Sequence, residues 1–90
     1  MNCLLCNRLA VGLLRDGSDR WRMGCPACGE YEFEGPFAEH VKVAKAKARV
    51  EVLRHLPRLA RASQRARMRG QRLTLDVRPG VEIVARLQSV

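Results

Sequence analysis

The sequence is poor in aromatic residues, in acidic residues and in long apolar runs. Trp, Tyr and Phe contribute four of its 90 residues, and nine Asp and Glu face 17 Lys and Arg, which leaves a formal net charge of +8. No stretch approaches the roughly 18 consecutive apolar residues of a membrane-spanning helix, so we expect no membrane partner. The excess of positive charge favours a polyanionic partner.

Motifs of the common enzyme classes are also missing. The sequence has no Gly-rich phosphate-binding loop, no Gly-x-Ser-x-Gly and no His-Glu-x-x-His, so we expect a protein that is not an enzyme. Cys3 and Cys6 stand where a signal peptide would need a basic start and an apolar run. This predicts a cytoplasmic, reducing environment, which disfavours structural disulfides.

The four cysteines form the strongest motif. Cys3-x2-Cys6 is followed after eighteen residues by Cys25-x2-Cys28, and two such pairs at this separation match the template of a zinc site. Two thiolates separated by two residues point into one small volume when the chain makes a tight knuckle, and a hairpin between the knuckles brings four sulfurs together. We predict one structural Zn²⁺ held by Cys3, Cys6, Cys25 and Cys28, which would supply much of the folding free energy of this small chain.

Three other uses of the cysteines stay open at this point. A C-x2-C redox pair normally accompanies a thioredoxin-like βαβ pattern, which the sequence around these cysteines lacks. Four thiolates also suit iron, either alone or in an iron–sulfur cluster. Two disulfides would suit a secreted chain.

The second cysteine pair carries a resemblance to a known family. Cys25-Pro26-Ala27-Cys28-Gly29 resembles the second knuckle of zinc ribbons, whose usual form is Cys-Pro-x-Cys-Gly, and residues 30–33 are similar to the third strand of small bacterial and phage zinc-ribbon proteins. The first knuckle, Cys3-Leu4-Leu5-Cys6-Asn7, departs from that form by lacking Pro and Gly. The resemblance covers residues 1–35. It implies a ribbon of three short antiparallel strands, of a kind often found in DNA- or RNA-binding proteins.

The chain divides into three predicted segments within a small, metal-stabilised α+β fold. The first is the zinc ribbon, whose first two strands are joined by a turn at Asp16-Gly17. The second holds two basic helices, and the third is a C-terminal β-hairpin with a turn at Pro79-Gly80 that packs on the helices or on a second copy of the chain. The segments are residues 1–35, 36–70 and 71–90.

Proline sets the expected bounds of the two helices. Pro36 suits the first turn of a helix, and good helix formers run from Phe37 to about His55. Pro57 removes a hydrogen-bond donor and clashes with the preceding turn, so we expect it to break the helical segment. A second helix then runs to about Arg69 and stops at Gly70.

Positive charge is concentrated in residues 35–72, which hold eleven Lys and Arg against Glu39 and Glu51, a net charge of +9. Basic residues recur here at steps of three or four, which places them along one side of a helix. The planar fork of Arg binds two phosphate oxygens at once, which suits a nucleic-acid backbone. The predicted nucleic-acid contacts are the two helical stripes and two arginines of the ribbon: Lys42, Lys45, Arg49, Arg54, Arg58, Arg61, Arg65, Arg69, Arg72, Arg20 and Arg22.

The sequence allows two interpretations of Trp21. It lies between Arg20 and Arg22, an arrangement that suits stacking of a base from a single strand. A lone Trp in a small ribbon is more often part of its core, and we interpret Trp21 as packing with Tyr31 or Phe33.

The predicted function is a small regulatory or accessory factor, of bacterial or phage type, that contacts the phosphate backbone of DNA or RNA. The alternative is a non-enzymatic adaptor or inhibitor that docks on a larger protein or ribonucleoprotein complex. The C-terminal hairpin supports it, because an apolar face and an open strand edge suit strand addition by a protein partner or a homodimer. The basic stripe would then be a solvated helix face or a contact for an acidic protein.

Overall fold

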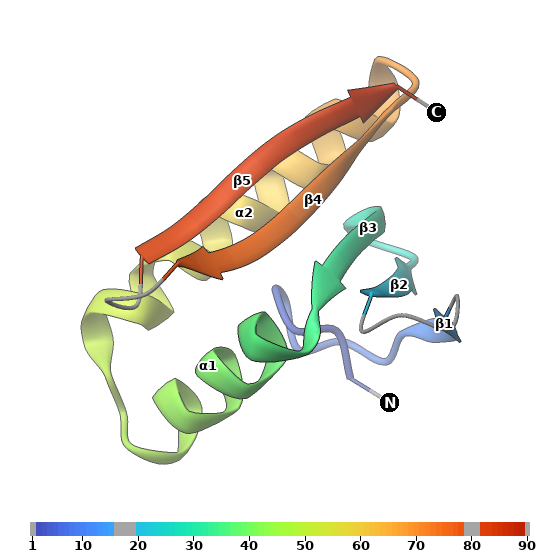
Figure 1. The fold of residues 1–90 in the computed structure, drawn as a ribbon. Helices are drawn as coiled ribbons and strands as arrows, with labels where there is room; N and C mark the ends of the chain where they lie inside the picture. The colour runs from blue at the N-terminus through green and yellow to red at the C-terminus, as the bar shows by residue number, and fades with distance from the viewer. Residues whose placement is uncertain (1, 16–19, 79–81, 90) are drawn as a thin grey trace.

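A computed structural model describes residues 2–15, 20–78 and 82–89 of the chain. Five strands form one mixed sheet in the order β1-β2-β3-β4-β5 (Figure 1), in which neighbouring strands are antiparallel except β3 and β4, which are parallel. The strands are β1 (Val11–Arg15), β2 (Arg20–Cys25), β3 (Gly29–Glu34), β4 (Gln71–Arg78) and β5 (Glu82–Ser89). The turns expected at Asp16-Gly17 and Pro79-Gly80 lie outside the described residues.

The predicted small α+β fold with two helices is confirmed, but the layout of the strands differs from the prediction. The sequence suggested a three-stranded ribbon and a separate C-terminal hairpin. Instead, β4 pairs in parallel with β3, with Tyr31 opposite Leu73 and Phe33 opposite Leu75. The hairpin therefore extends the sheet of the ribbon, and both helices form the crossover that two parallel neighbours require.

Two helices connect β3 to β4. α1 (Gly35–Ala46) begins with Pro36 in its first turn, as the fixed φ of proline favours. α2 (Val50–Met68) follows after a three-residue break. In Figure 1, α1 continues from the end of β3, and α2 lies behind β4 and β5.

The break between the helices lies at residues 47–49, and the prediction of a break near Pro57 is wrong because Pro57 lies inside α2. Ala48 adopts a φ of 51°, a left-handed conformation that costs a non-glycine residue about 1 kcal/mol. Packing offsets this cost, because turning the chain here lets both helices cover the same face of the sheet. α2 continues past Pro57 because Leu56 and Ala60, on either side of it, are buried.

The core lies between the helices and one face of the sheet. Side chains of a strand alternate between the two faces, so Tyr31, Phe33, Leu73 and Leu75 share the face that the helices cover, and all four are buried. Phe37 of α1 packs against Phe33, with ring centroids 6.3 Å apart. Cys3, Cys25 and Cys28 belong to the same buried cluster, so the cysteines lie inside the core that unites the three predicted segments.

Candidate functional site

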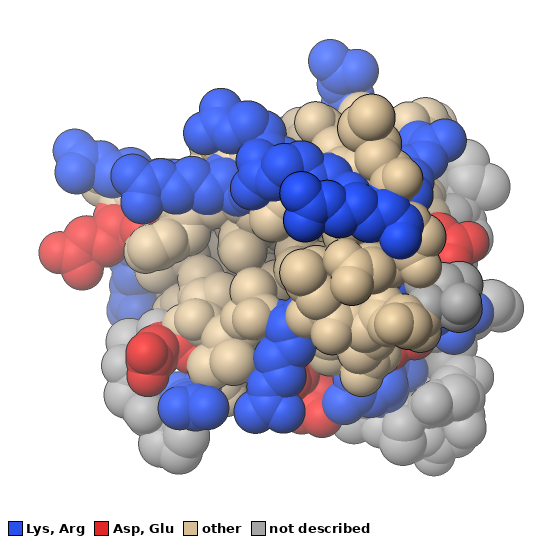
Figure 2. All heavy atoms as spheres, turned by 90° about the horizontal axis from the view of Figure 1, so that it is seen from above, with Lys and Arg blue, Asp and Glu red and all other residues tan. Residues whose placement is uncertain are grey.

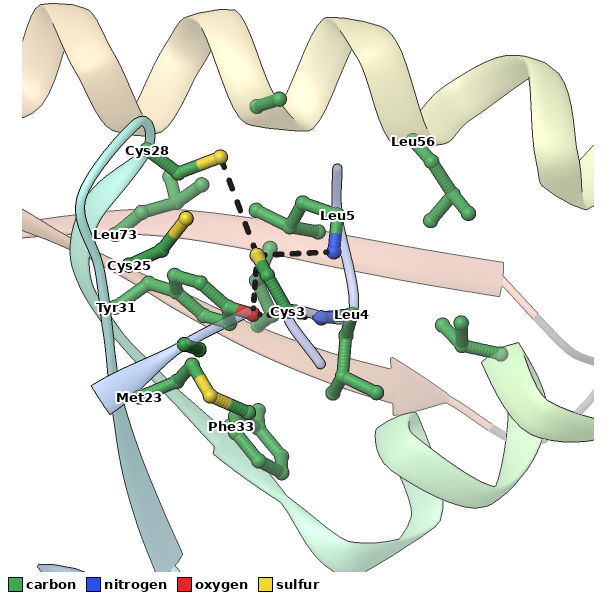
Figure 3. Packing of buried hydrophobic residues seen from close by; sticks show 14 of the residues in the cluster. Cys3, Leu4, Leu5, Met23, Cys25, Cys28, Tyr31, Phe33, Leu56 and Leu73 are labelled. Carbon is green, nitrogen blue, oxygen red and sulfur yellow. Dashed lines mark hydrogen bonds between the residues drawn. The ribbon is translucent and has the colours of Figure 1, made fainter. Parts of the chain in front are cut away.

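The four predicted metal ligands meet in one cluster. Their Sγ atoms all lie within 4.8 Å of one another. The separation is 4.0 Å between Cys3 and Cys28 (Figure 3) and 3.5 Å between Cys6 and Cys25. A tetrahedral ion with ligands at about 2.3 Å would need sulfur separations of about 3.8 Å, whereas a disulfide would need about 2.05 Å. The four cysteines are unpaired, and their positions fit the four ligands of a metal ion.

Two similar knuckles position the thiols. The residue after each pair has a left-handed backbone, with a φ of 64° at Asn7 and 84° at Gly29. Glycine takes this conformation at no cost, and Asn is among the few other residues that visit it. Asn7 therefore does in the first knuckle what glycine does in the second, and the departure of this knuckle from the usual zinc-ribbon form does not prevent the turn.

Backbone hydrogen bonds to sulfur lower the pKa of one thiol. Burial by itself raises the pKa of Cys25, but the N–H groups of Cys28 and Ala27 donate to its Sγ and bring the pKa to about 7. Burial and the neighbouring thiolates, Cys3 first among them, raise the pKa of Cys28 well above its usual value. Burial likewise raises the pKa of Cys6. Four thiolates thus repel one another when crowded together, and a bound cation would remove that repulsion.

Tyr31 supports the first knuckle through its hydroxyl. The backbone N–H of Leu4 donates to Oη of Tyr31 at 3.0 Å, and Oη lies 3.2 Å from Sγ of Cys3 (Figure 3). Because Oη already accepts from Leu4, its own hydrogen is available to donate to the sulfur. Burial, followed by the hydrogen bond and the charge of Cys3, raises the pKa of Tyr31 far above its ordinary value, so the hydroxyl stays a neutral donor.

α2 rests directly on the second knuckle. Oγ of Ser63, which is 1% exposed, donates to the carbonyl oxygen of Cys28 at 2.8 Å. A guanidinium nitrogen of Arg67 approaches the carbonyl oxygen of Pro26 at 3.5 Å, and a Cβ on Gly29 would lie 2.9 Å from Cδ of Arg67. The cysteine cluster and the basic helix are therefore joined by direct contacts. Sequence reasoning missed Ser63 and this role of Arg67, because neither follows a motif.

Four of the predicted nucleic-acid contacts form a row on the outer side of α2, and we call them the arginine row. Successive residues of a helix turn by about 100°, which places these four within about 60° of one another and opposite the buried Leu56, Ala60 and Ser63. All four are exposed and have no ion pair within the described ranges. Figure 2 shows Lys and Arg gathered in a row across one face of the molecule. The arginine row is Arg54, Arg58, Arg61 and Arg65.

The other predicted contacts on the helical segment lie outside this row. Arg69 stands at the end of α2, Arg49 precedes its first residue, and Lys42 and Lys45 lie on α1. All of these residues are exposed. The sequence predicted two stripes, and the break between the helices falls at residues 47–49, inside the shorter stripe that ends at Arg49.

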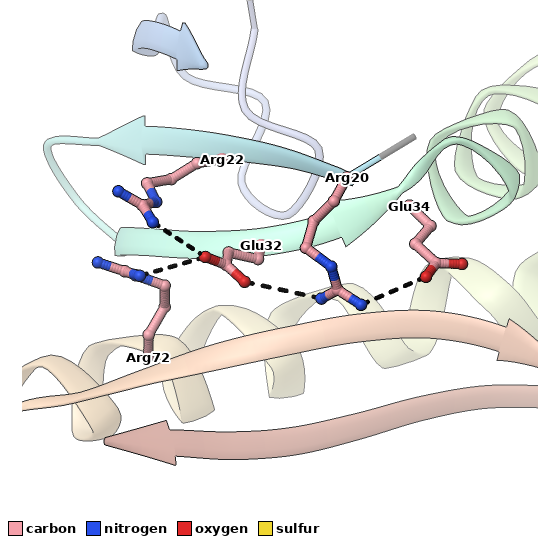
Figure 4. A network of polar contacts seen from close by, with 5 residues as sticks. All are labelled: Arg20, Arg22, Glu32, Glu34 and Arg72. Carbon is pink, nitrogen blue, oxygen red and sulfur yellow. Dashed lines mark hydrogen bonds and ion pairs between the residues drawn. The ribbon is translucent and has the colours of Figure 1, made fainter. Parts of the chain in front are cut away.

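The three remaining predicted contacts are held by carboxylates on the other face of the sheet, and we call them the paired arginines: Arg20, Arg22 and Arg72. Glu32 lies among them (Figure 4), with Oε1 3.1 Å from Arg22 and 3.2 Å from Arg72, and Oε2 3.6 Å from Arg20. Glu34 adds a contact to Arg20 at 3.3 Å and Glu30 one to Arg72 at 3.0 Å. Arg72 belongs to β4 and does not continue the helical stripe.

The paired arginines do not offer a surface comparable to the arginine row. The side chain of Glu32 is only 12% exposed, so the network is a partly buried feature of the sheet. Glu32 is the central one of the three acids of β3, and arginines enclose it.

Trp21 packs with the core, as we interpreted it from the sequence, and part of its surface stays accessible. It lies opposite Phe33 in the register of β2 and β3 and packs against the core cluster. It remains half-buried, with its indole lining a groove beside α1. The flanking Arg20 and Arg22 point to the opposite face of β2, so they do not frame this indole.

The comparisons with known proteins gave no relative. No protein-family model matches the chain, and neither the curated proteins nor the solved structures contain a significant match. Of the helices described here, none is long and apolar enough to cross a membrane.

Proposed function

We propose that this protein is a zinc-stabilised nucleic-acid-binding module whose α2 helix lies along a phosphate backbone. The observation that carries the proposal is the arginine row, four exposed guanidinium groups on one side of a helix with no carboxylate partner among the described residues. Guanidinium groups are weakly hydrated and match the geometry of phosphate oxygens.

Zinc is the metal that the proposal assigns to the four cysteines. Zn²⁺ takes four thiolates in a tetrahedron with no open position, so its role here would be to tie the two knuckles together. The knuckle that contains Cys25 and Cys28 in turn supports α2 through Ser63. Metal analysis of the purified protein should give one zinc per chain, whereas visible absorption and a matching iron content would assign the site to iron.

The test of nucleic-acid binding uses two charge reversals with the same net effect. Arg61→Glu changes the arginine row, and Arg86→Glu changes an exposed residue of β5 that makes no ion pair in the described structure. Fluorescence anisotropy with duplex DNA, single-stranded DNA and structured RNA would measure affinity across a salt series. Four phosphate contacts on duplex DNA predict a slope of log K against log salt of roughly −4.

The proposal expects the two variants to differ. Arg61→Glu should weaken binding by about tenfold and reduce the salt slope by about one, while Arg86→Glu stays close to the unmodified protein. Equal losses in both variants would show that the protein binds through its overall charge, and the specific role of α2 would be wrong.

An adaptor function is the second candidate, and the exposed edge of the sheet favours it. β5 is an outer strand whose side chains are mostly exposed, including Leu87 at 53%. Such an edge can accept a strand from a protein partner or from a second copy. Under this alternative, Leu87→Lys would abolish binding of the partner protein or dimerisation, and Arg61→Glu would leave both unchanged.

A further inference from the structure

A groove of about 630 Å³ lies between β2, the N-terminal segment and α1. Trp21 and Phe33 line it from the sheet, and Ala38 lines it from the helix. The side chains of Met23 and Phe33, 1% and 4% exposed, close its floor. The groove therefore has an apolar interior with a half-buried indole at its wall.

The rim of the groove on α1 is basic. Lys42 and Lys45 line it one helical turn apart, both are exposed, and no ion pair of either is found within the described residues. Glu39 is the one carboxylate among the described lining residues. A flat aromatic wall beside two ammonium groups suits a ligand that has both a planar ring and a negative charge, and an apolar peptide would leave both lysines without a role.

Resting on the proposed function, we infer that this groove takes an unpaired base of a single-stranded nucleic acid, stacked on Trp21, with the adjoining phosphates at Lys42 and Lys45. Stacking on an aromatic side chain tolerates any base, because every base has a π face, and lysines contact the backbone regardless of sequence. A base inside a duplex is covered on both faces by its neighbours. The groove would therefore give the module a preference for single strands that the arginine row does not supply.

The fluorescence of Trp21 tests this directly, because it is the one tryptophan in the sequence. The zinc-loaded full chain would be titrated with unlabelled 15-nucleotide oligothymidylate and with a 15-base-pair duplex. The single strand should quench Trp21 and shield it from acrylamide, and the duplex should do neither. Anisotropy of labelled versions of both ligands, measured in parallel, reports binding whether or not Trp21 responds.

Matched variants test whether the two lysines at the rim of the groove contact the nucleic acid. Lys42→Glu with Lys45→Glu should weaken single-strand binding by about tenfold or more, as the loss of two phosphate contacts predicts. Lys47→Glu combined with Arg86→Glu makes the same change of charge at exposed residues outside the groove and should have a smaller effect. Trp21→Phe keeps a ring for the core while reducing the stacking area, and its affinity for the single strand should fall while its circular dichroism is unchanged.

The outcomes separate this inference from the proposed function. If anisotropy shows single-strand binding and the fluorescence of Trp21 does not change, the groove is not the binding site for the base. The proposal of nucleic-acid binding would still hold. Equal quenching by duplex and single strand would overturn the preference for unpaired bases. The absence of binding to every nucleic acid tested would overturn both proposals.

Discussion

The arginine row and the paired arginines are built from the same residue type and differ in what surrounds them. The paired arginines lie on strands, where the register places Arg22 opposite Glu32 and Arg20 opposite Glu34. The arginine row lies on a helix, where Glu51 stands about one turn before Arg54 but makes no ion pair with the row in the described structure. The sequence therefore did not show which arginines are available to a ligand. Strand pairing brought carboxylates of β3 to the paired arginines and not to the arginine row.

The difference also assigns separate tasks to the two groups. An ion pair that is partly removed from water contributes to stability only while both partners remain, since the loss of one leaves the other uncompensated. An exposed arginine contributes little to stability, and its charge remains available to a ligand. We expect changes in the paired arginines to alter folding and changes in the arginine row to alter binding.

Removal of the metal should disrupt both the arginine row and the paired arginines. We expect it to have the largest effect. Cys3, Cys25 and Cys28 lie in the core, Cys6 packs against it, and the second knuckle supports α2. Structural zinc contributes on the order of 10 kcal/mol in small zinc domains, which exceeds the stability expected of a chain of this size. Chelation should therefore unfold the protein, seen as loss of the circular dichroism signal and of nucleic-acid binding.

Cys28→Ser gives the same test within the chain, because serine is a poor ligand for a soft metal site. Ser89→Cys, which adds a thiol at an exposed position of β5, serves as a control for handling and oxidation. A metal-free protein with native circular dichroism would show that the core folds without the ion, and the structural role of the centre would be wrong.

Glu32→Gln should disturb the paired arginines and leave the arginine row intact. We expect it to have the next largest effect. The variant leaves Arg20, Arg22 and Arg72 close together without their central carboxylate, and it should lower the free energy of unfolding by about 2 kcal/mol. Urea denaturation would measure this loss, and anisotropy should show unchanged affinity at temperatures where the variant is folded. Glu30→Gln is the matched control, since this side chain is 59% exposed and contacts one arginine. Weaker binding by folded Glu32→Gln would contradict the separation of tasks.

The sequence predicted the parts of the molecule that local spacing encodes. Two C-x2-C pairs placed all four thiols in one cluster because each knuckle is formed by neighbouring residues. Residues 30–33, which were expected to form a strand of the ribbon, lie in β3.

What the sequence did not predict depends on contacts between distant segments. No local signal marks the parallel pairing of β3 with β4, which turns a separate hairpin into part of the ribbon's sheet. Ala48 carries no sign of a helix break, since its left-handed backbone is imposed by the packing of both helices on one face. Tyr31 and Ser63 belong to the site only because the fold brings them to Cys3 and Cys28.

Ser63→Ala tests the hydrogen bond by which the helix of the arginine row contacts the cysteine cluster. Of the changes considered, we expect it to have the smallest effect on stability. The substitution leaves the carbonyl of Cys28 without its hydrogen bond at a buried position, and it should lower the free energy of unfolding by about 1 kcal/mol. Gln64→Ala removes an exposed polar side chain from the adjacent position of α2 and should stay within about 0.5 kcal/mol of the unmodified protein. Urea denaturation of the zinc-loaded variants measures both values, and equal stabilities would mean that the contact between Ser63 and Cys28 does not hold α2 on the knuckle. If the contact does hold it, Ser63→Ala should also speed the release of zinc to a chelator while Gln64→Ala does not, because the knuckle opens more often once the helix no longer restrains it.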